Sequence, residues 1–173
     1  MMKNRAEKIS SRAKRVATGL ALCGWAFAMA TPVQATPSSG FVPAPEWTGP
    51  FADLNFKTKT DNLDLKLQVK GAINLVVTRI NIAPNGTSGW HTHPGSSLVT
   101  VTEGQITLYD ADLCTPRRLG VGETFVDEGG DHVHLVRNET DSPAAVGAVQ
   151  MVEQGVPGRV DAPRPSNCPA DVQ

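Results

Sequence analysis

Apolar and polar residues alternate with period two over much of the chain after residue 62. Every second position from Leu63 to Val69 holds leucine or valine, with polar residues between. Successive side chains of a strand point to opposite faces, so this pattern predicts a half-buried strand. Further segments rich in β-branched residues predict strands at 73–82, 98–102, 105–109, 123–126, 132–137 and 144–152.

Turn residues separate the predicted strands. Pro84-Asn85-Gly86 ends the segment 73–82, and Glu103-Gly104 predicts a hairpin between 98–102 and 105–109. Seven or eight short strands at regular spacing, with no long helical pattern after residue 35, predict an all-β barrel or sandwich.

The predicted strands are flanked by two proline-rich segments. Residues 36–50 contain four prolines and two glycines, so we expect an extended arm here. Its aromatic residues are expected to dock on the barrel or on a second subunit. The predicted organisation is an arm at 36–62, a barrel at 63–156 and an irregular tail at 157–173.

Residues 1–35 have the pattern of a secretory signal. Six basic residues precede an apolar run over 16–29, and Val33-Gln34-Ala35 matches the small-x-small cleavage site. The alternative is an uncleaved anchor, but the run is shorter than the roughly 20 residues that cross a bilayer. We therefore expect cleavage after Ala35, a periplasmic or secreted location and no stable membrane anchor.

Charge and cysteine content change with this cleavage. The whole chain has 16 basic and 17 acidic residues; removal of 1–35 leaves 10 and 16, a formal charge of −6. Such an acidic domain argues against nucleic-acid binding. Cys114 and Cys168 remain as an even pair, which predicts either a disulfide that ties the tail to the barrel or two separate thiols.

All four histidines occur in two His-x-His pairs, His91 with His93 and His132 with His134. Residues i and i+2 of a strand share a face, so each pair can direct two imidazoles toward one point. Imidazole is the commonest metal ligand in proteins. Two such strands facing each other across a barrel predict a metal site.

The residues around these pairs resemble the two sequence motifs of the cupins. The segment from Gly86 through His91, His93 and Ser97, with Gly104 beyond it, is similar to the first motif. The second motif is matched by Gly122, Gly130, His134 and Asn138. The resemblance spans roughly 73–152 and implies a double-stranded β-helix, or jelly-roll barrel, that holds one metal ion on His91, His93 and His134.

One departure from the motif leaves the ligand set open. Ser97 or Leu98 stands where the first motif has a glutamate, and neither supplies an anionic ligand. Three histidines plus water rank first, four histidines including His132 rank second, and three histidines plus another carboxylate, such as Asp131, rank third. Iron(II) is favoured, with manganese, zinc, nickel and copper as alternatives.

Three functions of different kinds remain open. The first is a metal-dependent enzyme, an oxygenase-type oxidoreductase that acts on a small molecule. The second is a non-catalytic binding or sensing domain, and the third is a structural or storage protein in which metal serves only stability. Tyr109 and Arg79 are the candidate substrate-binding residues. Cupins often pair through edge strands, so the resemblance also implies a homodimer.

Overall fold

The structure, a computed structural model, describes residues 35–172, which belong to one compact unit. Apart from Ala35, the predicted signal therefore lies outside the described residues. Within them the chain forms no helix, and so no helix that could cross a membrane. Twelve strands are present: β1 (Ser39–Phe51), β2 (Leu54–Lys59), β3 (Asp64–Val69), β4 (Ile73–Thr87), β5 (His91–Thr92), β6 (Ser97–Glu103), β7 (Gln105–Asp110), β8 (Arg117–Gly120), β9 (Thr124–Asp127), β10 (His134–Arg137), β11 (Ala144–Glu153) and β12 (Val160–Asp161).

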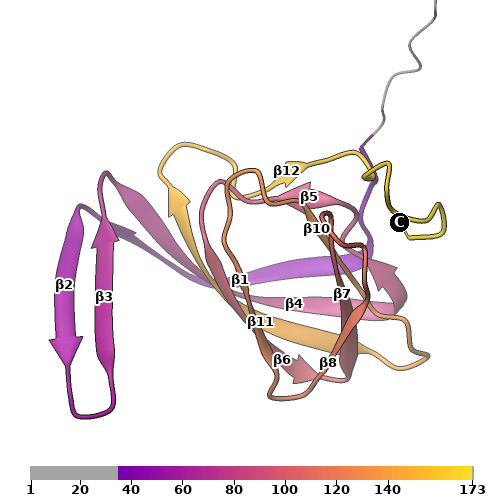
Figure 1. The fold of residues 1–173 in the computed structure, drawn as a ribbon, viewed down its shortest axis with the longest axis horizontal. Coiled ribbons are helices and arrows are strands. Elements are labelled where there is room, and N and C mark those ends of the chain that lie inside the picture. Colours follow the sequence, from indigo (N-terminus) through magenta and orange to yellow (C-terminus); the bar gives the residue numbers. More distant parts are fainter. Residues whose placement is uncertain (1–34, 173) are drawn as a thin grey trace, which may run out of the picture. The chain divides into compact units, whose positions relative to one another are not determined.

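Ten of these strands form the barrel (Figure 1). One side is built from β1, β4, β11, β6 and β9, and the other from β12, β5, β10, β7 and β8. The two sides join where β10 meets β4, at the pair Arg137 and Thr87. This antiparallel arrangement is an all-β, double-stranded β-helix fold, as predicted.

The predicted arm is extended, and most of it is a barrel strand. β1 pairs with β4 from Phe51 opposite Ile73 to Ser39 opposite Thr87, with two irregularities in register. The following segment is different, because β2 and β3 pair only with each other. The alternating segment that begins at Leu63 thus forms a strand, β3, but this strand lies in a separate two-stranded sheet.

The predicted hairpin at Glu103-Gly104 is wrong. β6 pairs with β9 and β11, whereas β7 pairs with β8 and β10, so the turn carries the chain from one side of the barrel to the other. Gly104 has φ +66°, and a Cβ there would lie 2.5 Å from the carbonyl oxygen of Pro143. Gly104 allows the close approach of the two chain segments at this crossing. The sequence Glu-Gly is the same for such a crossing and for a two-residue hairpin, so the sequence cannot tell them apart.

Two predicted strand boundaries also differ from the structure. β4 continues through Pro84-Asn85-Gly86 to Thr87, because Gly86 lies against Gly40 of β1, where a Cβ would be 2.8 Å from that residue's oxygen. β10 begins at His134 rather than at His132. The two-residue alternation expected for His132 and His134 therefore does not apply.

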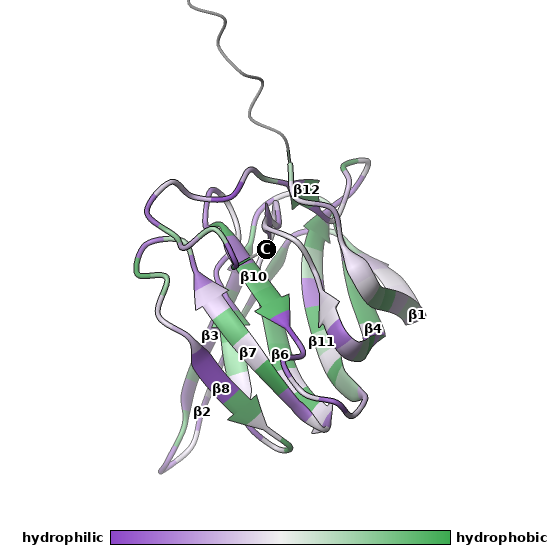
Figure 2. Ribbon diagram, turned by 90° about the vertical axis from the view of Figure 1, so that its right-hand side faces the viewer, coloured by the Kyte–Doolittle hydropathy of each residue, from purple (hydrophilic) through white to green (hydrophobic). Residues whose placement is uncertain are grey.

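Apolar side chains form two clusters within this framework. The larger lies inside the barrel and includes Ile82, Val101, Ile106 and Phe125. The smaller lies under the C-terminal tail and contains Trp90, Tyr109, Leu135, Ala162, Cys168 and Val172. Figure 2 shows how hydrophobic and hydrophilic residues interleave along the strands, as expected where one face is buried.

The tail is fixed to the barrel rather than loose. β12 pairs with β5, and Cys168 forms a disulfide with Cys114, their Cα atoms 5.3 Å apart. The indole nitrogen of Trp90 donates a hydrogen bond to the carbonyl of Val172 at 3.2 Å. These contacts hold residues 158–161 beside the strand that carries His91.

Candidate metal centre

Three of the four histidines meet inside the barrel. His91 of β5 lies opposite His134 of β10 in an antiparallel pair, and His93 follows β5 directly. The ring centroids are 4.4 Å apart for His91 and His134, 4.8 Å for His91 and His93, and 5.5 Å for His93 and His134. One nitrogen from each ring lies within 4.8 Å of the others, a spacing that allows one ion to contact all three.

Backbone carbonyls orient two of these rings. Nδ1 of His91 lies 2.9 Å from the oxygen of Gly89, and Nδ1 of His93 lies 2.6 Å from the oxygen of Gly158. A carbonyl only accepts hydrogen bonds, so each Nδ1 carries the proton and each Nε2 keeps its lone pair. A carbonyl partner of this kind sets the tautomer and orientation of a metal-binding histidine.

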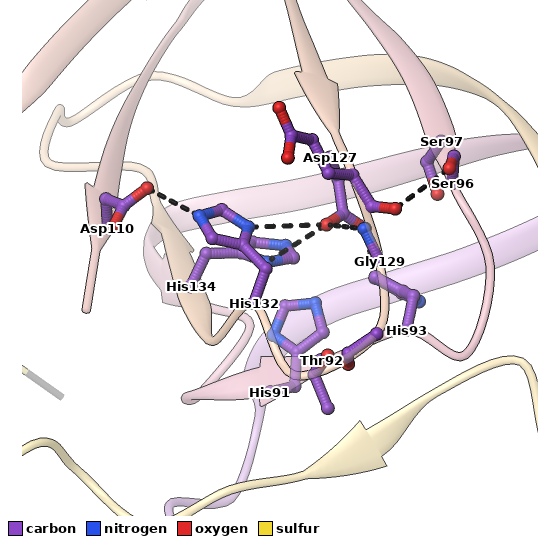
Figure 3. Close-up of polar contacts among 12 residues, drawn as sticks. His91, Thr92, His93, Ser96, Ser97, Asp110, Asp127, Gly129, His132 and His134 are labelled. Carbon is purple, nitrogen blue, oxygen red and sulfur yellow. Dashed lines mark hydrogen bonds and ion pairs between the residues drawn. The ribbon is translucent and has the colours of Figure 1, made fainter. Parts of the chain in front are cut away.

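A carboxylate that the sequence analysis did not select completes the group. Asp127 of β9 is 2 % exposed, and its Oδ1 accepts a hydrogen bond from the amide of Gly129 at 3.0 Å. Its Oδ2 lies 3.9 Å from Nε2 of His93 and has no hydrogen-bond partner among the described residues. Nδ1 of His134 likewise has none, and it lies 3.8 Å from Oδ1 of Asp127 (Figure 3).

The position of Asp127 accounts for the missing glutamate of the first motif. Asp127 is the cross-strand partner of Ser97 in the ladder between β6 and β9. The carboxylate absent at Ser97 is thus present on the neighbouring strand. The carboxylate predicted at Asp131 is exposed and lies outside this group.

His132 lies beside the site, between two carboxylates. Its Nε2 is 2.6 Å from Oδ2 of Asp110, and its Nδ1 is 3.6 Å from Oδ1 of Asp127 (Figure 3). Burial lowers the pKa of His132, but the hydrogen bond and charge of Asp110, aided by Asp127, outweigh burial and raise it. His132 groups with Asp127 and His134, and the predicted four-histidine arrangement is not among the groups that the described residues form.

Burial keeps the imidazoles of His91 and His134 neutral. It lowers the pKa of His91 to about 2, helped by the charges of His134 and Arg159. The pKa of His134 is also lowered, again mainly by burial, although Asp127 opposes this change. Neutral imidazole is the form that binds metal.

The donor set fits a divalent metal ion. Three imidazoles and one carboxylate are suitable ligands for iron, manganese, zinc, nickel or copper. Four buried side-chain atoms of the described residues lack a hydrogen-bond partner, on Asp127, His132, His134 and Arg137. Buried polar atoms of this kind are unusual in a folded protein, and two of the four, Oδ2 of Asp127 and Nδ1 of His134, belong to the proposed donor residues.

Comparison with known proteins concerns the barrel that carries these residues. Residues 78–150 match the family described as "Cupin domain" (Cupin_2). The chain contains a cupin domain. It is 34% identical over 113 residues to Nectarin-1 of Nicotiana plumbaginifolia, covering 62% of this chain and 47% of Nectarin-1. The chain thus spans about half the length of this curated relative.

Several solved structures are also similar to the cupin domain. The polyketide cyclase RemF from Streptomyces resistomycificus has 18% identity and a TM-score of 0.48, with 72% of this chain and 78% of that chain covered. An oxalate oxidase has 26% identity and a TM-score of 0.41, with 50% and 45% covered. A double-stranded β-helix protein from Klebsiella pneumoniae has 17% identity and a TM-score of 0.44, with 64% and 84% covered.

Three of the four candidate ligands, His91, His93 and Asp127, line a cavity of about 280 Å³ inside the cupin barrel. Its walls are mostly apolar, from β4, β6, β9 and β11, and β1 closes one side with Phe41, Pro43 and Pro45. The polar or charged side chains on its lining are those of Ser38, Thr78, His91, His93, Ser97, Asp127, Gln150 and Arg159.

The two predicted substrate-binding residues lie elsewhere. The hydroxyl of Tyr109 donates a 2.6 Å hydrogen bond to Glu139, and its ring belongs to the cluster under the tail. Arg79 pairs with Glu103 at 2.8 Å on the outside of the barrel. Neither lines the cupin cavity, because alternation alone does not say which face of a strand is the inner one.

Proposed function

We propose that this cupin domain binds one divalent metal ion on His91, His93 and His134, with Asp127 as the fourth donor, and uses it to act on a small molecule. The observation that carries the proposal is the pair of buried, unpartnered atoms on Asp127 and His134. Oδ2 of Asp127 lies 3.9 Å from Nε2 of His93, and His134 belongs to the group of three histidines. Iron(II) is the favoured ion, and the reaction is of the oxygenase type.

The chemistry divides between the ion and the chain. A bound divalent ion supplies a Lewis acid with open coordination positions for substrate or oxygen. The carbonyls of Gly89 and Gly158 hold two ligands in the binding tautomer. The mostly apolar walls lower the local dielectric constant, which strengthens electrostatic interactions within the cavity. His132 and Asp110 hold a proton beside the buried Asp127.

The second candidate is a non-catalytic binding or sensing cupin. It is favoured by the cavity lining, on which Asp127 is the only carboxylate among the described residues. Since Asp127 already belongs to the metal-binding group, no separate acid–base pair faces the cavity. Unchanged small-molecule binding with no metal-dependent turnover would favour this second function.

Two further proposals concern the setting of the protein. The disulfide between Cys114 and Cys168 supports export to the periplasm or outside the cell, since disulfides persist in oxidising compartments. A homodimer is supported by Val42 and Trp47 of β1, which are 59 % and 73 % exposed. The acidic balance after residue 35 gives no support to nucleic-acid binding.

Elemental mass spectrometry of the purified protein tests the metal site. We expect close to one metal ion per chain in the wild type and almost none in His91→Ala/His134→Ala. Tyr109→Phe is the matched control, since it changes a buried residue away from the cavity and should retain the metal.

Two results would contradict the proposal. One is the absence of metal from the wild type after anaerobic reconstitution with each of the five ions. The other is full turnover by metal-free protein.

A further inference from the structure

Arg159 is the only lysine or arginine that lines the cavity within residues 35–172. It lies in the tail between Gly158, whose carbonyl contacts His93, and Val160, which pairs with Thr92 of β5. Its side chain is 30% exposed, so it lies at the boundary between the cavity and solvent. Arg159 therefore belongs to the mouth of the cavity.

The guanidinium of Arg159 is held in place but not fully occupied. Its Nε and Nη2 each lie 2.7 Å from Oδ1 of Asp161, and Nη2 also donates to the carbonyl of Ser88 at 2.6 Å. Nη1 takes part in none of these contacts. Arginine has five N–H donors in a rigid plane, so the two on Nη1 remain for a further acceptor.

The charge of Arg159 acts inside the cavity. Arg159 lines the same cavity as His91, His93 and Asp127. The cavity walls beside it are largely apolar. A negative group brought into such surroundings needs a charged or hydrogen-bonding partner, because desolvation of an unpaired charge is unfavourable.

We propose that Arg159 selects a small molecule carrying a carboxylate, which the guanidinium binds at the mouth while the rest of the molecule extends toward the three histidines. The inference rests on the proposed metal function, because the other end of the same molecule is expected to lie at the proposed metal site. Arginine binds a carboxylate well through its planar donors. The cavity volume of about 280 Å³ lies just below the range of about 300–1,000 Å³ typical of ligand pockets, so the molecule is small.

A purely structural role for Arg159 gives different expectations. If Arg159 only holds the tail on the barrel, it does so through its ion pair with Asp161. Substitution of either residue would then weaken the binding of any ligand. As a carboxylate-binding residue, Arg159 would bind an anion more tightly once Asp161 no longer neutralises it. The variant Asp161→Asn therefore separates the two roles.

Isothermal calorimetry on the zinc-loaded protein tests the assignment. The probes are malonate, which has one carboxylate for the metal and one for Arg159, and its uncharged diamide, malonamide. We expect Arg159→Gln to weaken malonate binding about 10- to 100-fold, the effect of losing a charged hydrogen-bonding partner, and to leave malonamide binding unchanged. Arg159→Lys is expected to restore part of the affinity, and Asp161→Asn to increase it.

Arg164→Gln is the matched control, because Arg164 is a tail arginine that bonds to the carbonyls of Pro165 and Cys168 and does not line the cavity. It should bind malonate as the wild type does. If Arg159→Gln fails to fold, Arg159→Lys and Asp161→Asn carry the test, and weaker malonate binding by Asp161→Asn contradicts the proposal.

Zinc content is measured on every sample, so the two proposals fail in different ways. A wild type without zinc overturns the metal site and the inference built on it. One zinc per chain with equal malonate affinity in wild type and Arg159→Gln, or with no malonate binding at all, overturns only the role of Arg159.

Discussion

His134 begins β10 and Asn138 follows its last residue, and both are almost completely buried. Both polar side-chain atoms of Asn138 have partners. Its Nδ2 lies within hydrogen-bonding distance of the carbonyls of Ile82, Ala83 and Ser142, and its Oδ1 accepts from the amide and hydroxyl of Thr140. At the other end, Nδ1 of His134 and Oδ2 of Asp127 have no partner among the described residues.

This difference distinguishes a structural cluster from a binding site. Satisfied buried hydrogen bonds stabilise a fold, whereas a buried polar atom without a partner costs about 1–3 kcal/mol. Asn138 of the second motif holds a turn through its hydrogen bonds. His134, four residues earlier, keeps a ring nitrogen that can still bind a ligand. If this contrast is correct, substitutions around Asn138 lower the unfolding free energy without changing metal binding, whereas substitutions around His134 change metal binding.

Acid has the largest expected effect, and it acts on the histidine end. The lowered pKa values of His91 and His134 mean that the folded protein resists protonation while the unfolded chain, at its usual pKa of 6.5, accepts it. Stability is thus present above pH 6.5 and lost as pH falls. We expect metal-free protein to lose roughly 4 kcal/mol of unfolding free energy between pH 7 and 5, measured by urea denaturation.

The raised pKa of His132 offsets only part of this loss, because one histidine opposes two. Its raised pKa contributes stability that is present below pH 6.5 and is lost as pH rises. The control is His91→Ala/His134→Ala, in which most of the pH dependence should vanish. An equally steep loss in that variant would break the comparison.

Asn138→Ala is expected to have the next largest effect, at the satisfied end. The substitution leaves the carbonyls of Ile82, Ala83 and Ser142 and the Thr140 amide without their side-chain partner. We expect the unfolding free energy to fall by about 3 kcal/mol. Chemical denaturation measures this loss, and metal content per folded chain should not change. Loss of the metal from folded Asn138→Ala would show that the two ends are not separate.

Asp127→Asn is expected to have the smallest effect on the unfolding free energy among these perturbations, and to weaken metal binding. Asparagine keeps an oxygen for the amide of Gly129, so the unfolding free energy of metal-free protein should stay within about 1 kcal/mol of wild type. Metal affinity, followed by competition with a chelator, should fall at least about tenfold because the anionic donor is lost. Unchanged affinity would remove Asp127 from the donor set.

Much of this site could be predicted from the sequence because it depends on local spacing. His91 and His93 lie two residues apart, and His134 matched a family motif, so their convergence required little more than the fold class. His132 shows the limit of spacing as evidence. Its partnership with Asp110 arises because β10 begins two residues later, and strand boundaries are not fixed by sequence pattern.

Asp127 could not be selected because its role depends on strand register. The register between β6 and β9 places it opposite Ser97, and no local pattern encodes which residues of two distant strands face each other. One usable signal was present: Phe125 and Asp127 alternate with exposed Thr124 and Val126, which puts the carboxylate on the buried face. Arg159 had no such signal, since it lies in a tail that was expected to be irregular.

The contact between His93 and the carbonyl of Gly158 joins residues 65 positions apart. At about 5–20 residues per second of synthesis, the ribosome adds Gly158 roughly 3–13 s after His93. His134 also emerges in that interval. The proposed site, with the carbonyl that orients His93, is therefore complete only after residue 158 has been translated.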